Sequence, residues 1–514
     1  MENSRTKNSV LIMATSGMKQ LLTLLLSFAS RTVFIYVLGA NYLGVNGLFS
    51  NILMLLSLTD LGIGSAIAYY LYKPISVHDK ERIKSLMLFY KRCYRVVGLS
   101  IIGFGCMVMP FLNKLVNVEQ PIPENIYLIY LLYLLDTAFT YLFWAYKQAF
   151  MTANQKQYKI EKINIYYVVI GCCIDIIVLL VFRSFIAYLI FKMVIVIVKN
   201  LVIARMVDKE YPYLKEKDIK ELTRGEVKQF FKGALNEIIF KLGSTLFNST
   251  LNIIVSICIG TIFIGYYSNY YMVIGQVGSI SALITASIIA GIGNVVATES
   301  SSKVFTVYKV LNMGVFLINS FCTICLFQLL NSFVHLWLGK MGNEYVLSQI
   351  IVGLMCVDFY LNNSCQVIAT YRAAAGKFEV GRNRQVIAGI LNIPLSILFI
   401  KLFGLPGAFL SPVLCKLLIT VCPFLVDLER ILFHQTWRIA LKDYFYKFGL
   451  TIITGIVVWL SCLYFHEKTV LYFLIEVFLT ILLSIVILVG ATYRTPEVQA
   501  LMKRFHLPQI LHLS

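Results

Sequence analysis

The sequence predicts an all-α, polytopic membrane protein of about fourteen transmembrane helices, arranged as two pseudo-symmetric six-helix bundles and two extra C-terminal helices. Three observations predict this class. Of the 514 residues, 59% are hydrophobic and 14% are charged, and the mean hydropathy is +0.77. The apolar residues form continuous runs that can cross roughly 30 Å of hydrocarbon as helices, in which backbone groups bond internally. Finally, short motifs recur at a constant separation, which indicates an internal repeat.

Each expected helix is one uninterrupted apolar run of a length that spans a bilayer. The first is not a cleaved signal peptide, because its apolar region is too long and no small-x-small site ends it. The hydrophilic stretch 208–233 reads as a partly helical cytoplasmic linker. The expected spans are 10–38, 43–72, 86–112, 125–148, 163–182, 184–206, 229–258, 262–296, 306–338, 346–371, 383–402, 406–427, 444–465 and 469–491.

These spans divide the chain into two repeated halves and an appendix. We expect an N-terminal six-helix bundle over 1–207, a linker over 208–228 and a second six-helix bundle over 229–430. Two additional transmembrane helices follow over 431–492, and a cytoplasmic tail over 493–514.

Basic residues indicate the orientation. Lys and Arg concentrate in the two tails and the even-numbered loops, and this asymmetry places both termini in the cytoplasm. The net charge of +19 therefore reports topology and predicts no nucleic-acid partner, although it favours anionic lipid at the inner leaflet. The odd-numbered loops hold only Lys114, Arg183, Lys340, Lys401 and Lys468.

Two pairs of motifs carry the repeat. "LGANYLG" at 38–44 matches "IGTIFIG" at 259–265, and "FMTANQK" at 150–156 matches "YRAAAGK" at 371–377, with the same offset in the numbering. Internal repeats of this kind are common in secondary transporters, whose substrate site lies between the halves. Because six is an even number of spans, the pseudo-twofold axis is predicted to run along the membrane normal. The glycines of the first pair permit a tight turn or a close helix approach.

With the basic residues near span ends assigned to the neighbouring loops, four cations remain within the membrane, where each costs about 2.5–3.5 kcal/mol. Arg31 lies deeper than a side chain that simply reaches the interface, whereas Lys19 could snorkel from the cytoplasmic end. Lys241 and Lys416 belong to the second half. A cavity lined by such cations suits a phosphate or pyrophosphate group, which arginine binds bidentately.

Acids within the spans offer partners or coupling sites. Asp60 could pair with Arg31, and Glu237 lies four residues before Lys241, the favourable helical order for an ion pair. The remaining acids could each carry a coupling proton or ion, and the sequence does not rank them: Asp136, Asp175, Asp358 and Glu476. Asp136 and Asp358 correspond within one residue under the repeat.

No cofactor or metal is expected. "CC" at 172–173 and "CTIC" at 322–325 resemble redox or metal spacings, but they lie in apolar helices without a nearby His or second Cys pair. The outer loops are also too short for catalysis: the longest, "NKLVNVEQPIPE" at 113–124, offers only Glu119 and Glu124 for acid–base work. We therefore do not expect an enzyme, and a purely structural scaffold would not explain the repeat and the buried cations.

The run "SRTVFIYVLGANYLGVNGLFSNILMLLSLTDLGIGSAIAYYLYKP" at 30–74 resembles the bacterial polysaccharide-biosynthesis flippases of the multidrug/oligosaccharidyl-lipid/polysaccharide exporter superfamily. An arginine late in the first span, LG-x(3)-LG, "GLF" and "DLGIG" in that order carry the likeness. It implies export of an undecaprenyl-diphosphate-linked oligosaccharide by alternating access in the bacterial cytoplasmic membrane. The head group would bind Arg31, Lys19, Lys241 and Lys416 in a central cavity, and a glycan polymerase could be a partner.

Two transporter alternatives remain. A drug or metabolite antiporter of the same superfamily would line its cavity with acids for cationic substrates, whereas the first span holds only cations. A flippase for the lipid-linked peptidoglycan precursor would share the cationic cavity, and binding of the two head groups would separate these readings.

Overall fold

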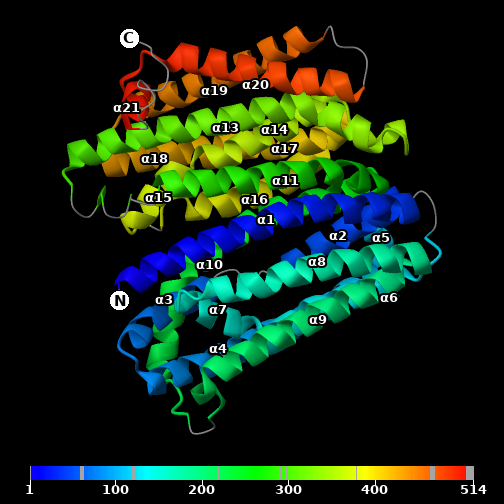
Figure 1. Ribbon diagram of the computed structural model, residues 1–514, viewed down its shortest axis with the longest axis vertical. Helices are drawn as coiled ribbons and strands as arrows, with labels where there is room; N and C mark the ends of the chain where they lie inside the picture. Colours follow the sequence, from blue (N-terminus) through cyan, green and yellow to red (C-terminus); the bar gives the residue numbers. More distant parts are fainter. Residues whose placement is uncertain are drawn as a thin grey trace. The chain divides into compact units, whose positions relative to one another are not determined.

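The computed structural model describes residues 2–57, 63–117, 122–216, 219–289, 292, 295–296, 299–377, 379–463 and 469–504 (Figure 1). Each expected span is helical over most of its described part. Within those residues, eleven helical segments are long and apolar enough to cross a membrane. The helices are α1 (Glu2–Leu38), α2 (Ala40–Leu56), α3 (Ile63–Ser76), α4 (Lys80–Val108), α5 (Leu112–Leu115), α6 (Ile126–Phe143), α7 (Ala145–Ala153), α8 (Gln157–Phe182), α9 (Phe185–Glu210), α10 (Arg224–Cys258), α11 (Thr261–Ile289), α13 (Ser301–Leu338), α14 (Gln349–Ser364), α15 (Gln366–Ala374), α16 (Arg382–Phe403), α17 (Leu405–Cys415), α18 (Cys422–Phe433), α19 (Trp437–Cys462), α20 (Val470–Thr492) and α21 (Pro496–Arg504).

By their contacts the residues form two compact units, Met1–Gly265 and Tyr266–Ser514. The seventh expected span, which is α10, therefore packs with the first six spans in this structure. The predicted boundaries of the repeated halves, at 207/208 and 228/229, describe the internal repeat and not the contacts. They stay a prediction.

In the first unit, α1 packs along α8, and α6 packs against α4 and α9 (Figure 1). Local signals set several helix ends. The side chains of Asp79, Asn125 and Ser184 accept hydrogen bonds from the first turns of α4, α6 and α9. Thr223 and Glu226 form a reciprocal capping box at the start of α10.

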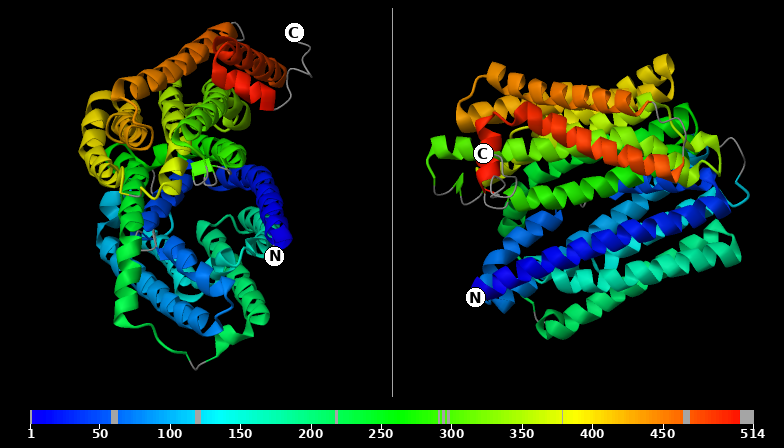
Figure 2. Two further views of the ribbon diagram at one scale, coloured as in Figure 1. Left: turned by 90° about the vertical axis from the view of Figure 1, so that its left-hand side faces the viewer. Right: turned by 45° about the horizontal axis from the view of Figure 1, so that its top comes forward.

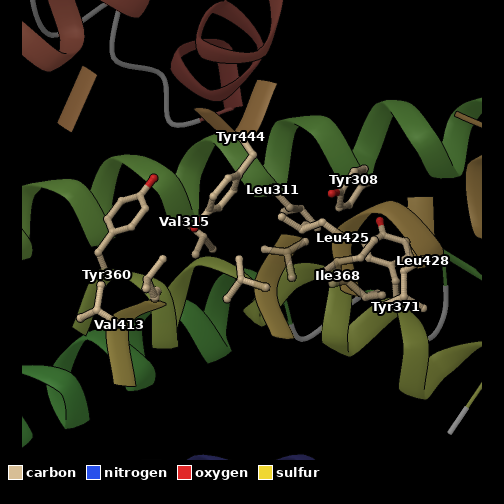
Figure 3. Close-up of a cluster of buried hydrophobic side chains, with 14 residues drawn as sticks. Tyr308, Leu311, Val315, Tyr360, Ile368, Tyr371, Val413, Leu425, Leu428 and Tyr444 are labelled. Atoms are coloured by element: carbon tan, nitrogen blue, oxygen red, sulfur yellow. The ribbon is translucent and has the colours of Figure 1, made fainter. Parts of the chain in front are cut away.

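In the second unit, α13 is the central helix and packs against α14, α19 and α20. Figure 2 shows α19 and α20 side by side at the edge of this unit. A buried cluster lies between α13, α14, α15, α18 and α19, and it includes Tyr308, Tyr371 and Leu428 (Figure 3). A π-helix, η5 (Lys416–Val421), interrupts the helical run between α17 and α18.

Large apolar side chains are exposed along the helices that have few protein neighbours. Met107 on α4 is 68% exposed, and Leu471 and Phe478 on α20 are 66% and 65% exposed. Such surfaces are stable against lipid tails, so these helices present them to the bilayer.

The structure repeats at the separation that the motifs predict. Helices α7 and α15 begin and end at equivalent positions of the repeat: Ala145 corresponds to Gln366, and Ala153 corresponds to Ala374. The same offset in the numbering relates the last residue of α8 to the last residue of α16. Backbone residues with positive φ recur at the same offset: Gly39 and Gly260, Gln155 and Gly376, and Arg183 and Gly404. Two halves with the same helix breaks and the same turns are duplicated structures, so the predicted repeat is confirmed for these segments.

The glycines of the repeat make a reciprocal contact between α2 and α11. A Cβ at Gly44 would lie 2.1 Å from the carbonyl oxygen of Thr261, and a Cβ at Gly265 would lie 2.2 Å from that of Ala40. Ala40 and Thr261 are themselves equivalent positions of the repeat. An isologous contact of this form is what a local twofold axis produces. The prediction of a close helix approach at these glycines is confirmed.

The linker is held to the first unit by ion pairs. Its acids bind basic residues at the ends of α4, α7 and α8, with N–O distances of 2.5–2.8 Å. The pairs are Asp208–Lys147, Glu210–Lys156, Glu210–Lys159, Glu216–Lys84, Glu221–Arg92 and Glu226–Arg82. The prediction that the linker is partly helical is confirmed by a 3₁₀ turn, η3 (Pro212–Lys215), and by α10, which begins at Arg224.

Candidate functional site

A cavity of about 390 Å³, lined by both polar and apolar side chains, lies between α2, α6 and α9 of the first unit. One acid and one lysine line it, Asp136 from α6 and Lys192 from α9. Hydroxyl groups complete the polar wall, and they come from Ser50, Ser57, Tyr133, Thr137 and Tyr141. The cavity can therefore hold a charged, hydrogen-bonding group within an otherwise apolar bundle.

Asp136 is only partly paired in this cavity. Its Oδ1 atom is buried and has no hydrogen-bond partner within the described ranges. Its carboxylate interacts electrostatically with Lys192, which also interacts with Asp175 on α8. Because burying an unpaired carboxylate oxygen is unfavourable, this position can take a proton, a water or a substrate donor.

Arg31 belongs to the same region of the first unit. It lies on α1, and it interacts electrostatically with Tyr188 of α9. The ammonium of Lys192 lies 5.4 Å from the centroid of the same Tyr188 ring. Tyr188 is buried, and both cations interact with it. Arginine and lysine side chains can each bind an anionic group such as a phosphate.

Lys19 is neutralised within the first unit. Its ammonium lies 2.9 Å from the carboxylate of Glu161 on α8. Glu161 is buried and also accepts hydrogen bonds from Gln157 and Asn164. This partner was not among the predicted acids, because Glu161 sits in the basic run "YKIEK" at the start of α8, which the sequence assigns to a loop.

In the second unit, two predicted residues meet. The ammonium of Lys416 lies 2.5 Å from a carboxylate oxygen of Asp358 on α14, and the other oxygen accepts from Asn362 at 3.0 Å. Lys416 is the first residue of η5 and is 8% exposed. A π-helical turn often marks a functional position in a helix.

The two acid–lysine pairs occupy equivalent spans. Asp136 and Asp358 lie on the fourth span of each half, and Lys192 and Lys416 on the sixth. In the second unit the lysine and the carboxylate form an ion pair, whereas in the first unit both side chains line a cavity. Sequence reasoning missed Lys192, since it was grouped with the basic residues of the following linker. The correspondence of Asp136 with Asp358 was the signal that could have found it.

Among the residues that the structure describes, the other predicted site residues do not line this cavity. Lys241 lies half-buried on α10, and the side chain of Glu237 on the same helix is outside what the structure describes. Asp60 is also outside the described residues. Glu476 on α20 accepts a hydrogen bond of 2.6 Å from Gln328 on α13.

The cysteines form no disulfide, and four of them are buried: Cys172, Cys356, Cys415 and Cys462. All twelve thiols are free. In the part of the chain that the structure describes, no three His, Cys, Asp or Glu side chains are grouped as a metal site.

Comparison with known proteins identifies the fold. No protein-family model and no curated protein matches the chain. Among solved structures it is similar to the lipid II flippase MurJ in an inward closed conformation, with a TM-score of 0.67 and 15% identity over 94% of this chain and 99% of that one.

Similarity extends to drug transporters. An inward-facing multidrug resistance MATE family transporter of the MOP superfamily gives a TM-score of 0.63 and 13% identity, covering 80% of this chain and 94% of that one. A variant of the Vibrio cholerae MATE transporter VcmN gives 0.58 and 13%, covering 85% and 99%. The chain thus has the membrane-transporter fold that these proteins share.

Proposed function

We propose that this chain is a flippase that moves undecaprenyl-diphosphate-linked oligosaccharide repeat units from the cytoplasmic to the outer leaflet of a bacterial cytoplasmic membrane. The flipped units supply surface-polysaccharide synthesis, and a glycan polymerase is a candidate partner. Transport occurs by alternating access, without covalent chemistry, and both termini are cytoplasmic.

The observation that carries the proposal is the pair of cations around Tyr188, beside the cavity between α2, α6 and α9. Arg31 is one of the features through which the N-terminal run resembles repeat-unit flippases, and Lys192, which lies over the ring of the same Tyr188, adds a second positive charge. A diphosphate needs charge-assisted donors when it leaves water, and each such hydrogen bond contributes about 1.5–3 kcal/mol.

The acids near Lys192 have a role in the empty state. Asp136 and Asp175 balance its charge when no substrate is present. An arriving diphosphate competes with them for the ammonium, and a displaced carboxylate can take up a proton. This exchange couples substrate binding to protonation without a separate ion site.

The membrane potential assists export in this proposal. Moving one charge through 100 mV is worth about 2.3 kcal/mol, so a group with about two negative charges gains roughly twice that on leaving an inside-negative cell. Flipping in reconstituted vesicles that ignores an imposed potential would contradict this part.

The test in cells uses a strain that lacks the gene. We expect a lipid-linked oligosaccharide to accumulate on the cytoplasmic leaflet, with loss of surface glycan. The wild type should reverse both effects, Arg31→Ala should not, and Arg31→Lys should restore part of the export. Lys303→Ala is the matched control, since Lys303 forms an exposed pair with Glu299 on the second unit. Full export by Arg31→Ala at normal protein level would refute the assignment.

Two other substrates are tested by the same lipid extract. The acids Asp136 and Asp175 favour a drug or metabolite antiporter as a second candidate, since they suit cationic substrates. Intact surface glycan and no lipid intermediate would move the assignment there. The similarity to the lipid II flippase favours a peptidoglycan precursor, and accumulation of that lipid alone would select it.

A further inference from the structure

A second, smaller pocket lies inside the second unit, between α13, α14, α18 and α19. Its volume is about 20 Å³, enough for one water-sized sphere. It lies away from the acid–lysine pair of Lys416, and neither Lys416 nor Asp358 lines it. The polar residues that do line it include Asn319, Ser364, Glu429, Asp443 and Lys447.

Within the described residues, Asn319 places an unsatisfied acceptor in the lining of this pocket. The residue is 2% exposed, and its Nδ2 donates to the carbonyl oxygen of Tyr360 at 3.0 Å. Its Oδ1 is buried and has no hydrogen-bond partner among the residues that the structure describes. Leaving a buried acceptor unsatisfied costs free energy, so this oxygen is expected to face a donor or a cation within the pocket.

The charges of the lining do not cancel. Glu429 is 8% exposed and accepts a hydrogen bond of 2.7 Å from the hydroxyl of Tyr308. Asp443 pairs with Lys447 at 2.6 Å, which leaves the Glu429 carboxylate as the excess charge of the lining.

One further cation reaches Glu429 from outside the pocket. Lys309 interacts with it electrostatically, but Lys309 is exposed, and its ammonium lies 4.9 Å over the ring of Phe305. Lys447 in the lining also interacts with Glu429 but is paired with Asp443, so the remaining negative charge is balanced either by a proton on Glu429 or by a bound cation.

We infer that this pocket binds one small monovalent cation, for which Na⁺ is the probe, between the Glu429 carboxylate and Asn319 Oδ1. Carboxylate, amide and hydroxyl oxygens are the ligands that hard cations prefer. The single excess charge matches a monovalent ion, and the volume admits one. Figure 3 shows Tyr444 and Tyr360 near Val315, on the wall of this pocket.

The inference goes beyond the proposed function and does not depend on it. One wall of the pocket is α19, the first of the two helices outside the repeat, so the bound ion would join this appendix to the repeated half. Binding is then a property of the empty protein, whatever substrate it carries.

The test measures thermal unfolding of the purified full chain in lipid nanodiscs, in NaCl or choline chloride at equal ionic strength. We expect Na⁺ to raise the Tm of the wild type by about 2–4 °C over choline. Glu429→Gln and Asn319→Leu should each abolish the difference. Asp427→Asn removes a carboxylate from the same helix outside the pocket, where it pairs with Arg384, and should keep the difference.

Three results would overturn the inference. An identical wild-type Tm in both salts means that the pocket holds water only. A sodium effect that persists in both pocket variants means that the ion binds elsewhere. If the sodium-dependent rise in Tm is also lost in Asp427→Asn, its loss is a general response to the removal of a carboxylate and does not report binding in the pocket. If Glu429→Gln fails to fold, the wild-type comparison and Asn319→Leu still decide.

Discussion

Each half of this chain places a lysine within its sixth span and supplies a carboxylate for it from its fourth. In the second unit the charges of Lys416 and Asp358 are fully paired, whereas Asp136 keeps one oxygen unpaired beside Lys192, among the residues that the structure describes. In the proposed mechanism the second-unit pair is structural and the first-unit pair is available for substrate binding. Substitutions at the two lysines should therefore have different consequences.

Lys192→Ala should reduce export without a large loss of protein. The substitution removes one charge-assisted contact to the diphosphate, which corresponds to about 10- to 100-fold in transport rate. Lys192→Arg should retain much of the activity. The measurement is surface glycan in the complemented deletion strain, with protein level followed by immunoblot. Normal export by Lys192→Ala would remove this residue from the site.

Breaking the Lys416–Asp358 pair should destabilise the fold. Asp358→Ala leaves the buried ammonium uncompensated, at a cost of about 3–5 kcal/mol. The double variant Lys416→Met/Asp358→Leu should recover most of this loss. Arg384–Asp427 has the same N–O distance of 2.5 Å but is about one-third exposed, so Asp427→Ala should cost at most about 1 kcal/mol. Thermal unfolding distinguishes these, and an equal Tm loss in both single variants would contradict the argument.

Among elements, the turns and helix breaks that recur in both repeats position the charged side chains. The apolar runs predicted the helices, because lipid requires continuous apolar helices. Of the fourteen expected spans, eleven correspond to described segments that are long and apolar enough to cross a membrane. They did not predict the breaks at Trp144 and Cys365 or the π-helical turn at Lys416, which depend on tertiary packing. For the same reason the sequence predicted Arg31, Lys19 and Lys416 as cations within spans but did not predict their partners, since one sequence does not determine helix rotation.

Adding a methyl group at the reciprocal glycine contact should separate α2 from α11. Gly44→Ala or Gly265→Ala would place Cβ within 2.1–2.2 Å of a backbone carbonyl oxygen, so the helices must shift. We expect a lower Tm for both variants. Gly275→Ala on α11 is the control, because no atom lies within 4 Å of its Cβ. A normal Tm in both variants would contradict this packing.

The ion pairs of the linker should protect it from proteolysis. Exposed pairs contribute little singly, but Arg82, Lys84 and Arg92 together hold three acids of the linker, Glu226, Glu216 and Glu221. Replacing all three by Ala should speed trypsin cleavage between 211 and 224, compared with Lys303→Ala. An unchanged digestion rate would show that the linker is held by other contacts.

The linker should also respond to acid. A hydrogen bond from Arg92 lowers the pKa of Glu221, so this pair stabilises the folded linker above the ordinary carboxyl pKa. The contribution is lost as the pH falls through the lowered pKa. Protection of the linker should therefore be constant around neutral pH and decline only in acid, as intrinsic-rate-corrected hydrogen exchange would report. Loss of protection near neutral pH would contradict this assignment.

For the whole molecule, we propose that the repeat, the cations within the spans and the fold shared with membrane transporters serve to move a polar head group through the bilayer. The resemblance of the N-terminal run to repeat-unit flippases supports an oligosaccharide as the proposed cargo. The most direct measurement is flipping of an undecaprenyl-diphosphate-linked oligosaccharide in vesicles that contain only this protein. We predict transport above protein-free vesicles, reduced about tenfold or more in Arg31→Ala and Lys192→Ala and retained in Lys303→Ala. No transport by the wild type, or equal transport by all variants, would contradict the account.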